Sequence, residues 1–297
     1  IIGMRVRAKC NESGLNHYMG IAISAFIATM LAWASTLLPA EWTSTPWHPL
    51  LACALFIVPG VPLINFVDDM LDNYIQVGIV RAVNTLLMVS AMAFGIAFAV
   101  KLCSIGDFFP TISMVPHHNY LEYAIAAAIS AMGFSMIFNI QRRLLWVVAI
   151  GGIIAVCTRN FVNLGPSTNN IGLDMGLVIG SFSGSVLVSL IAIKAVHWFH
   201  VPNHVLTIPS VIPMIPGVLM YRMLFGLINM NVQSIDQVTP LMKAIESGVN
   251  SGLVIMCIAL GVAIPNIFGR KYIASSKNKR LAEILKERKA RGKFVEW

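Results

Sequence analysis

The sequence is poor in charged residues: Asp, Glu, Lys and Arg together fill 11% of its 297 positions, less than half the usual share in a soluble domain. Hydrophobic residues fill 57%, and the mean hydropathy is +0.76. A water-soluble fold could not bury that much apolar surface. The shortage of charge therefore argues against a soluble domain and indicates a membrane protein.

Sequence signatures of catalysis and of metal binding are missing too. The chain has no H-E-x-x-H pair, no G-x-S-x-G elbow and no phosphate-binding loop, so we expect neither an enzyme nor a cofactor. Its five cysteines show no C-x-x-C spacing, which argues against a disulfide framework or a zinc site. His197, His200 and His204 have no carboxylate or cysteine nearby in sequence, so we expect no metal there.

The formal net charge of +8 comes mainly from the end of the chain. Ten Lys and Arg residues lie between Arg270 and Lys293, beyond the last apolar run, so we expect no nucleic-acid partner. The segment Lys277–Arg291 is predicted to form a basic cytoplasmic helix that anchors the topology. Its alternative role is attraction to anionic lipid headgroups.

The apolar residues fall in runs of about 20, the length that crosses a hydrocarbon core of about 30 Å. The fold class we predict is all-α, a polytopic transmembrane helical bundle in the lipid bilayer. About eight spans are expected, at residues 17–38, 48–71, 77–102, 119–139, 143–162, 173–196, 205–228 and 243–268.

The basic residues between these spans fall on one side of the predicted membrane. They are Arg5, Arg7, Lys9, Arg81, Arg142, Arg143, Lys194 and the basic tail. By the positive-inside rule, both observed ends of the chain are predicted to be cytoplasmic. The 69–80 loop gives the weakest support, because Asp68, Asp69 and Asp72 lie in or beside it.

A short motif occurs twice in apolar surroundings. Val58-Pro59-Gly60-Val61 recurs as Ile215-Pro216-Gly217-Val218. In the predicted orientation the two segments cross the membrane in opposite directions, which indicates two repeats of inverted topology. We expect the end of the first repeat at 1–105, an outer linker at 106–118, the second repeat at 119–270 and a basic cytoplasmic tail at 271–297.

Proline and glycine in the two motifs predict broken helices. Proline removes a backbone hydrogen bond, and glycine lets the chain unwind. Non-helical backbone at membrane depth persists only beside protein or a water-filled cavity, and in transporters such breaks aim helix N-termini at anionic groups. An ordinary proline kink is the alternative for one motif. The matched pair favours a binding site.

The motifs resemble those of the bacterial threonine/serine exporter family. The residues that carry the resemblance are Pro59-Gly60-Val61-Pro62-Leu63-Ile64-Asn65 with Asp68-Asp69, Ile212-Pro213-Met214-Ile215-Pro216-Gly217-Val218 with Tyr221, and Gly133-Phe134-Ser135-Met136-Ile137-Phe138-Asn139 before paired arginines. The similarity runs from about Ile1 to Ile273.

This resemblance implies a secondary transporter of the bacterial cytoplasmic membrane that exports threonine, serine or a related small polar metabolite along a proton or ion gradient. Family members have about ten helices behind a soluble region, so we expect that region and two helices to be missing here. The alternatives are export of a dicarboxylate such as succinate, a passive channel and a scaffold subunit. The oligomeric state stays open, a homo-oligomer included.

Superposing the two motifs places Asn65 on Arg222. Arg222 is predicted to bind a substrate carboxylate in a bidentate pair, with hydrogen bonds from Asn65 and Tyr221. The alternative is that Arg222 pairs with Glu246 or reaches the outer headgroups. The predicted substrate site also includes the helix breaks themselves, at Pro59, Gly60, Pro216 and Gly217.

Further polar residues lie within or near the spans. Asp68 and Asp69 are predicted to couple transport to protons or ions, because a carboxylate held at membrane depth can exchange protons near neutral pH. If they lie in the cytoplasmic loop, they are only solvated. Asn84 and Asn250 are predicted to line the cavity, with helix–helix hydrogen bonding as the alternative.

Two more expectations concern the second repeat. Arg159 and Asp174 flank a short outer loop and are expected to pair. Gly176, Gly180 and Gly184 recur at every fourth position, which predicts close helix packing rather than chemistry.

Overall fold

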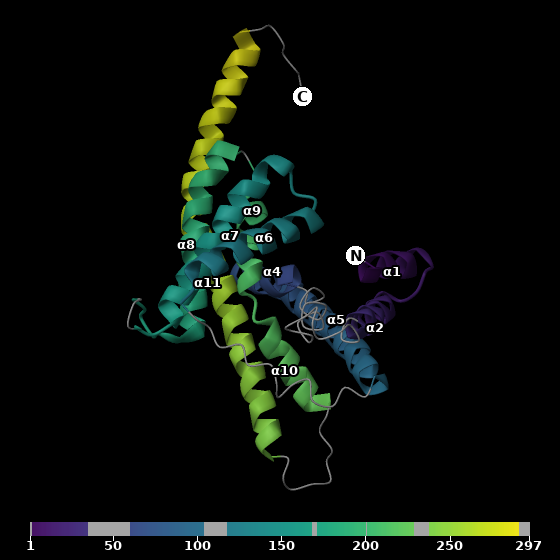
Figure 1. The fold of residues 1–297 in the computed structure, drawn as a ribbon. Helices are drawn as coiled ribbons and strands as arrows, with labels where there is room; N and C mark the ends of the chain where they lie inside the picture. The colour runs from purple at the N-terminus through teal and green to yellow at the C-terminus, as the bar shows by residue number, and fades with distance from the viewer. Residues whose placement is uncertain are drawn as a thin grey trace. The chain divides into compact units, whose positions relative to one another are not determined.

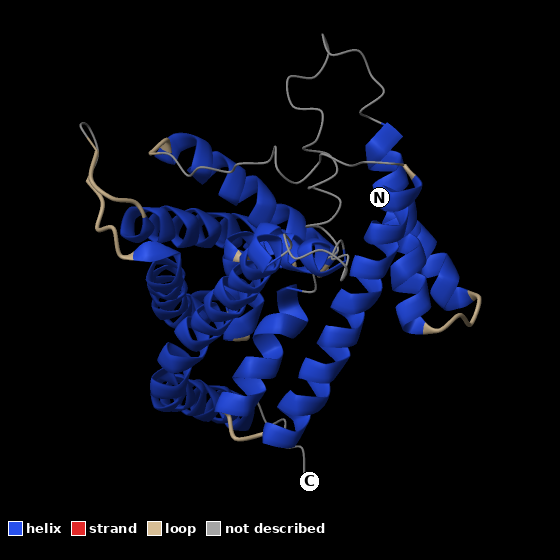
Figure 2. Ribbon diagram, turned by 90° about the horizontal axis from the view of Figure 1, so that it is seen from below, coloured by secondary structure: helices blue, strands red, loops and turns tan. Residues whose placement is uncertain are grey.

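The computed structural model describes residues 2–34, 60–103, 118–167, 171–199, 201–228 and 238–290. Within these ranges every regular element is a helix, as predicted (Figures 1 and 2). The α-helices are α1 (Ile2–Glu12), α2 (His17–Ala34), α4 (Gly60–Leu71), α5 (Ile75–Leu102), α6 (Tyr120–Ile137), α7 (Leu145–Asn163), α8 (Gly176–Phe199), α9 (Asn203–Val211), α10 (Gly217–Ile228) and α11 (Val238–Ala290). Short 3₁₀ turns, η2 (Arg142–Leu144) and η3 (Ile212–Met214), precede α7 and follow α9.

Six of the described helices are long and apolar enough to cross a membrane. They cover His17–Ala34, Ile75–Leu102, Tyr120–Ile137, Arg142–Asn163, Gly176–Val196 and Leu241–Gly269. These match the six predicted spans that lack the repeated motif. The other two are 48–71, whose first part lies outside the described residues, and 205–228, which is divided among α9, η3 and α10.

The chain forms two compact units. Unit 1 consists of Ile1–His117 and Ile215–Met256, and unit 2 of His118–Met214 and Cys257–Trp297. Helix α11 contributes its first part to unit 1 and the rest to unit 2 (Figure 1). It continues without interruption into the basic tail, so the predicted helix at Lys277–Arg291 is confirmed up to Ala290 as the end of α11. The stretch beyond Gly269 is rich in Lys, Arg, Glu, Leu and Ala, which are strong helix formers.

In unit 1, small residues bring the helices close together. Gly95 of α5 lies against Ala22 and Ala25 of α2, where an added Cβ would collide with the Ala22 carbonyl. The turn between α4 and α5 is fixed by Asn73, whose φ of 67° is left-handed, and by a 2.9 Å hydrogen bond from the Tyr74 N–H to the Asp69 carbonyl. This helix-ending motif reverses the chain within three residues, so α5 begins at Ile75.

In unit 2, α7 packs against α6, α8 and α9. The core cluster draws on all four helices and η2; its buried members are Ala131, Leu144, Val148, Ala192, Ala195 and Leu206. Consecutive glycines of α7 face different neighbours, since Gly152 lies against Ala127 and Ala131 of α6 and Gly151 against Ser210 of α9. Helix α7 therefore organises the unit.

The predicted glycine ladder of α8 is confirmed at two of its three positions. An added Cβ at Gly180 would lie 2.6 Å from the Arg159 carbonyl, and one at Gly184 would lie 2.5 Å from the Ala155 carbonyl. Gly176 was wrongly included, because no atom of the described residues lies within 4 Å of its Cβ position. Its φ of +84° at the start of α8 is a left-handed conformation that glycine adopts readily.

A pair of matched substitutions tests the α7–α8 contact. Gly180→Ala should lower the melting temperature of the purified protein in detergent, because overpacking against backbone costs about 1–3 kcal/mol. Gly133→Ala on α6 is the control, because its Cβ position is open, and it should leave the melting temperature unchanged or slightly raised. Equal melting temperatures for both variants would contradict the contact.

Candidate functional site

Each copy of the repeated motif is followed by a helix. Helix α4 covers Gly60–Leu71 and α10 covers Gly217–Ile228. The two glycines are buried and lie 157 positions apart, which is the shift that superposes the motifs. The second break is confirmed, because η3 and two non-helical residues precede α10. Pro59 and the residues before it lie outside the described residues, so the first break stays a prediction.

The second break is visible on both sides. Helix α9, with Pro209 inside it, passes into η3, and α10 begins after Ile215 and Pro216. The Gly217 N–H donates to the Ile215 carbonyl at 2.8 Å, and the Met220 N–H donates to the Pro216 carbonyl at 3.1 Å. Proline has no N–H. Pro209, Pro213 and Pro216 therefore reduce the number of backbone N–H groups that need a hydrogen-bond acceptor where the helix is interrupted.

Arg159 of α7 reaches this break. Its Nη1 donates to the carbonyl of Met214, the last residue of η3, at 3.4 Å, and its Nε donates to the side-chain oxygen of Asn160 at 3.3 Å. Both bonds are long and both acceptors are neutral. Within the described part of the chain, the guanidinium has no acidic partner. An ionisable group within a predicted span normally marks a functional site.

The predicted pair between Arg159 and Asp174 does not form. The chain after α7 folds back on itself through hydrogen bonds from Leu173 to Phe161 and from Asp174 to Leu164, both between backbone groups. Asp174 has a φ of 51° and is exposed beside Gly165. Arg159 instead lies on the face of α7 that meets η3.

Asn160 adds a second polar group at this point. Its residue is only 2% exposed, and its side-chain amide nitrogen has no hydrogen-bond partner among the described residues. An unsatisfied buried donor costs about 1–3 kcal/mol. The site therefore combines a cation, an open amide donor and the carbonyl of an interrupted helix.

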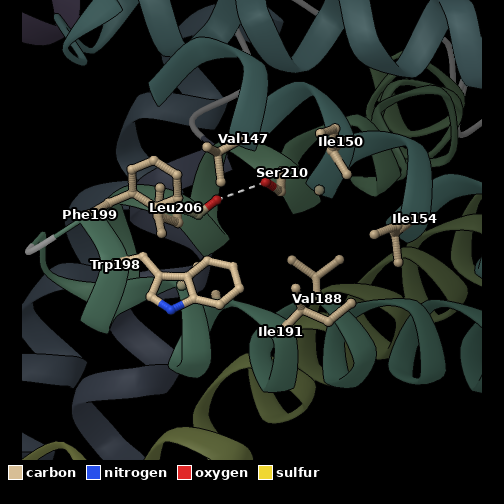
Figure 3. A pocket seen from close by; sticks show the side chains of 12 residues that line it. Val147, Ile150, Ile154, Val188, Ile191, Trp198, Phe199, Leu206 and Ser210 are labelled. Atoms are coloured by element: carbon tan, nitrogen blue, oxygen red, sulfur yellow. Dashed lines mark hydrogen bonds between the residues drawn. The ribbon is translucent and has the colours of Figure 1, made fainter. Parts of the chain in front are cut away.

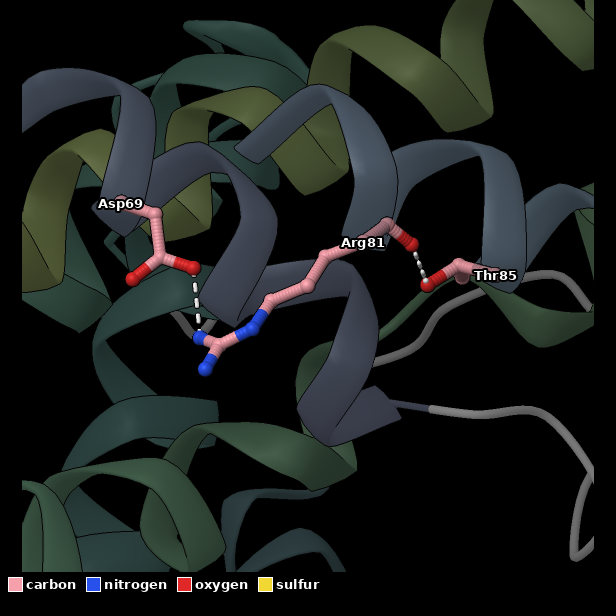
Figure 4. A network of polar contacts seen from close by, with 3 residues as sticks. All are labelled: Asp69, Arg81 and Thr85. Carbon is pink, nitrogen blue, oxygen red and sulfur yellow. Dashed lines mark hydrogen bonds and ion pairs between the residues drawn. The ribbon is translucent and has the colours of Figure 1, made fainter. Parts of the chain in front are cut away.

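The first motif leads into a polar stretch of α4. Asn65, Asp68 and Asp69 are half-buried. Asp69 forms an ion pair with Arg81 of α5 at 2.5 Å, and the Thr85 hydroxyl donates to the Arg81 carbonyl at 2.7 Å (Figure 4). The ion pair was not predicted. It compensates the charge of Asp69 and joins the two arms of the α4–α5 hairpin.

The other predicted site residues lie on α5, α10 and α11. The side-chain oxygen of Asn84 accepts a 2.7 Å hydrogen bond from the Tyr18 hydroxyl of α2, which is the helix–helix bond weighed as its alternative. Arg222 is half-buried in α10, and Asn250 is exposed on α11. Tyr221 belongs to α10, but its side chain lies outside the described residues. The substrate and cavity roles of these residues stay predictions.

Sequence reasoning missed a buried polar stripe on α8. Ser181, Ser185 and Ser189 are 0% exposed, and Ser189 donates to the Val262 carbonyl of α11 at 2.9 Å. Asn203 and Asn266 are hydrogen-bonded to each other nearby, and one polar atom of each has no partner among the described residues. The signal in the sequence was the serine at every fourth position, which places all three on one helix face.

Two family models match the chain. The one described as "Threonine/Serine exporter, ThrE" matches residues 123–268, and the one described as "Putative threonine/serine exporter" matches residues 1–103. No solved structure matches the chain. The first match includes Arg159, Asn160 and the second copy of the motif, and the second match includes the first copy together with Asp69 and Arg81.

The Asp69–Arg81 pair can be measured with a double-mutant cycle. We expect Asp69→Asn and Arg81→Gln to show a coupling free energy of unfolding below about 1 kcal/mol, because the Arg81 side chain is 50% exposed and partly solvated pairs are weak. Thermal unfolding in detergent of the wild type, both single variants and the double variant gives this value. A coupling of about 3 kcal/mol would show instead that the pair holds the hairpin together.

Proposed function

The chain belongs to the threonine/serine exporter family, and we propose that it exports threonine, serine or a related small amino acid from the bacterial cytoplasm. It is a multi-pass membrane protein of the exporter type. In this proposal export is driven by a proton or ion gradient, and both observed ends of the chain are cytoplasmic. The clustering of basic residues between alternate spans supports that orientation.

The observation that carries the proposal is the Arg159 guanidinium at the Met214 carbonyl. An amino-acid zwitterion needs a cation or N–H donors for its carboxylate and an acceptor for its ammonium group. Arg159 supplies the cation, and Met214 supplies a carbonyl oxygen three residues before the start of α10. The open amide donor of Asn160 can serve the carboxylate or a side-chain hydroxyl.

Arginine suits this role because its guanidinium has five N–H donors in a fixed plane, which can hold a carboxylate in a bidentate pair. Two of those donors now make long bonds to neutral oxygens. A carboxylate would replace them with shorter, charge-assisted bonds. Differential affinity of this kind is what lets a substrate shift a transporter between conformations.

Arg222 keeps its predicted role as a carboxylate-binding residue in this proposal. It lies in the second turn of α10, and superposing the motifs aligns it with Asn65 of α4. The N–H groups of the first turn of α10 can also bind an anionic group. Arg222 belongs to unit 1 and Arg159 to unit 2, so the contribution of each arginine is measured separately.

We expect Arg159→Gln to raise the KM for threonine about tenfold to a hundredfold, because a hydrogen bond to a charged group contributes about 1.5–3 kcal/mol. The measurement is counterflow of labelled threonine in proteoliposomes, with Arg222→Gln beside it. Lys101→Gln, at an exposed position near the end of α5, is the charge-matched control. Unchanged KM in Arg159→Gln would remove Arg159 from the site, and succinate competing better than threonine would favour a dicarboxylate exporter.

Ion coupling is tested at the neighbouring carboxylates. Asp68→Asn should abolish threonine flux driven by an imposed pH gradient while counterflow persists, because exchange needs no net proton movement. Asp69→Asn should show the same uncoupling together with lower thermal stability, because it also removes the ion pair to Arg81. Full gradient-driven flux in both variants would place the coupling group elsewhere.

A further inference from the structure

Unit 2 contains a cavity of about 270 Å³ between α7, α8 and α9 (Figure 3). Its walls are almost entirely apolar, formed by residues such as Ile150, Ile154, Val188, Ile191 and Leu206. The hydroxyl of Ser210 also lines it but already donates to the Leu206 carbonyl at 2.7 Å. Ile150 is 57% exposed and Ile191 45%, so the cavity opens at the surface of the unit. Nothing in these walls suits a zwitterionic amino acid.

One end of the cavity is marked by an aromatic pair. Trp198 and Phe199 lie with Leu206 at this end, and Ile154 lies at the other (Figure 3). The Trp198 residue is 79% exposed, so its indole is available to the surroundings. Tryptophan in membrane proteins concentrates where the hydrocarbon core meets the headgroups. This end of the cavity therefore has the character of a membrane interface.

Basic residues flank the same end. Arg143 is exposed in η2, four residues before Val147 of the wall, and its Nε donates to the side-chain oxygen of Gln141 at 2.8 Å. The spacing of Val147, Ile150 and Ile154 puts these three on one face of α7. Lys194 is exposed on α8, one turn before Trp198. Leu144 and Ala195, the chain neighbours of Arg143 and Lys194, belong to one buried cluster. The two cations therefore belong to the same end of the antiparallel pair α7 and α8.

We propose that this cavity binds an anionic phospholipid, with an acyl chain along the apolar walls and the phosphate between Arg143 and Lys194. The charges of headgroup and rim are complementary, and the walls match a hydrocarbon chain. The sequence predicts that this end is cytoplasmic, where anionic lipids give the membrane a negative surface. A second copy of this chain is a poorer occupant, because a symmetric contact would bring like charges together.

The test compares two lipids with identical acyl chains, phosphatidylglycerol and phosphatidylcholine, added to the delipidated full chain and measured by native mass spectrometry. We expect the wild type to bind phosphatidylglycerol preferentially. Removing both cations in Arg143→Gln/Lys194→Gln should reduce that preference about thirtyfold, since each basic residue near an anionic surface contributes a factor of about five. Arg143→Lys/Lys194→Arg keeps both charges and should keep the preference.

The matched control is Lys101→Gln/Lys243→Gln, which removes two exposed charges from other helices and should leave the preference unchanged. Ile191→Trp fills part of the cavity and should weaken binding of both lipids. The proposal is overturned if the wild type binds the two lipids equally. It is also overturned if Arg143→Gln/Lys194→Gln and Lys101→Gln/Lys243→Gln change the preference for phosphatidylglycerol by the same factor. Lipid binding that Ile191→Trp leaves intact would overturn it too. So would conversion of a dimer to a monomer by Ile191→Trp, because the cavity would then be covered by a second copy of this chain. None of these outcomes depends on threonine transport.

Discussion

Inside a bilayer, backbone N–H and C=O groups find no water, so each must be satisfied by the protein or by a polar cavity. Six long helices meet this requirement through their internal hydrogen bonds. The segment around the second motif does not, because η3 ends at Met214 and α10 begins within apolar sequence only at Gly217. The prolines around the second break reduce the number of donors, and Arg159 donates to the Met214 carbonyl. The candidate site follows directly from this backbone requirement.

The same environment decides how the helices pack. Lipid tails are as apolar as leucine, so burial alone does not hold membrane helices together, and close contact between small residues takes its place. Gly95 against α2 and Gly180 and Gly184 against α7 provide such contacts. Interhelical hydrogen bonds such as Ser189 to Val262 reinforce them. A rigid, closely packed frame around α7 is what can hold Arg159 at the break.

Much of the fold was predictable, because a run of about 20 apolar residues has few alternatives to a membrane-spanning helix. The second motif also predicted where α10 begins, since proline and glycine act locally. Local sequence could not identify the partner of Arg159, because η3 is 55 residues away along the chain. It also suggested an ion pair with Asp174 that the loop geometry excludes. The Asp69–Arg81 pair depends on the turn at Asn73, where the backbone is left-handed. An asparagine in a predicted loop was not enough to predict the geometry of that turn.

The central claim is that both copies of the motif lie in a polar, substrate-accessible space. Val61 and Val218 are the next residues in each copy, so single cysteines at these matched positions, in a background without native cysteines, report on both sites. The measurement is the rate of labelling by a water-soluble thiol reagent in proteoliposomes, with Ile129→Cys, 63% exposed on the apolar surface of α6, as the lipid-facing control. The account predicts that both motif cysteines react much faster than the control and that saturating threonine slows both. Labelling at the rate of the control, or rates that threonine does not change, would contradict it.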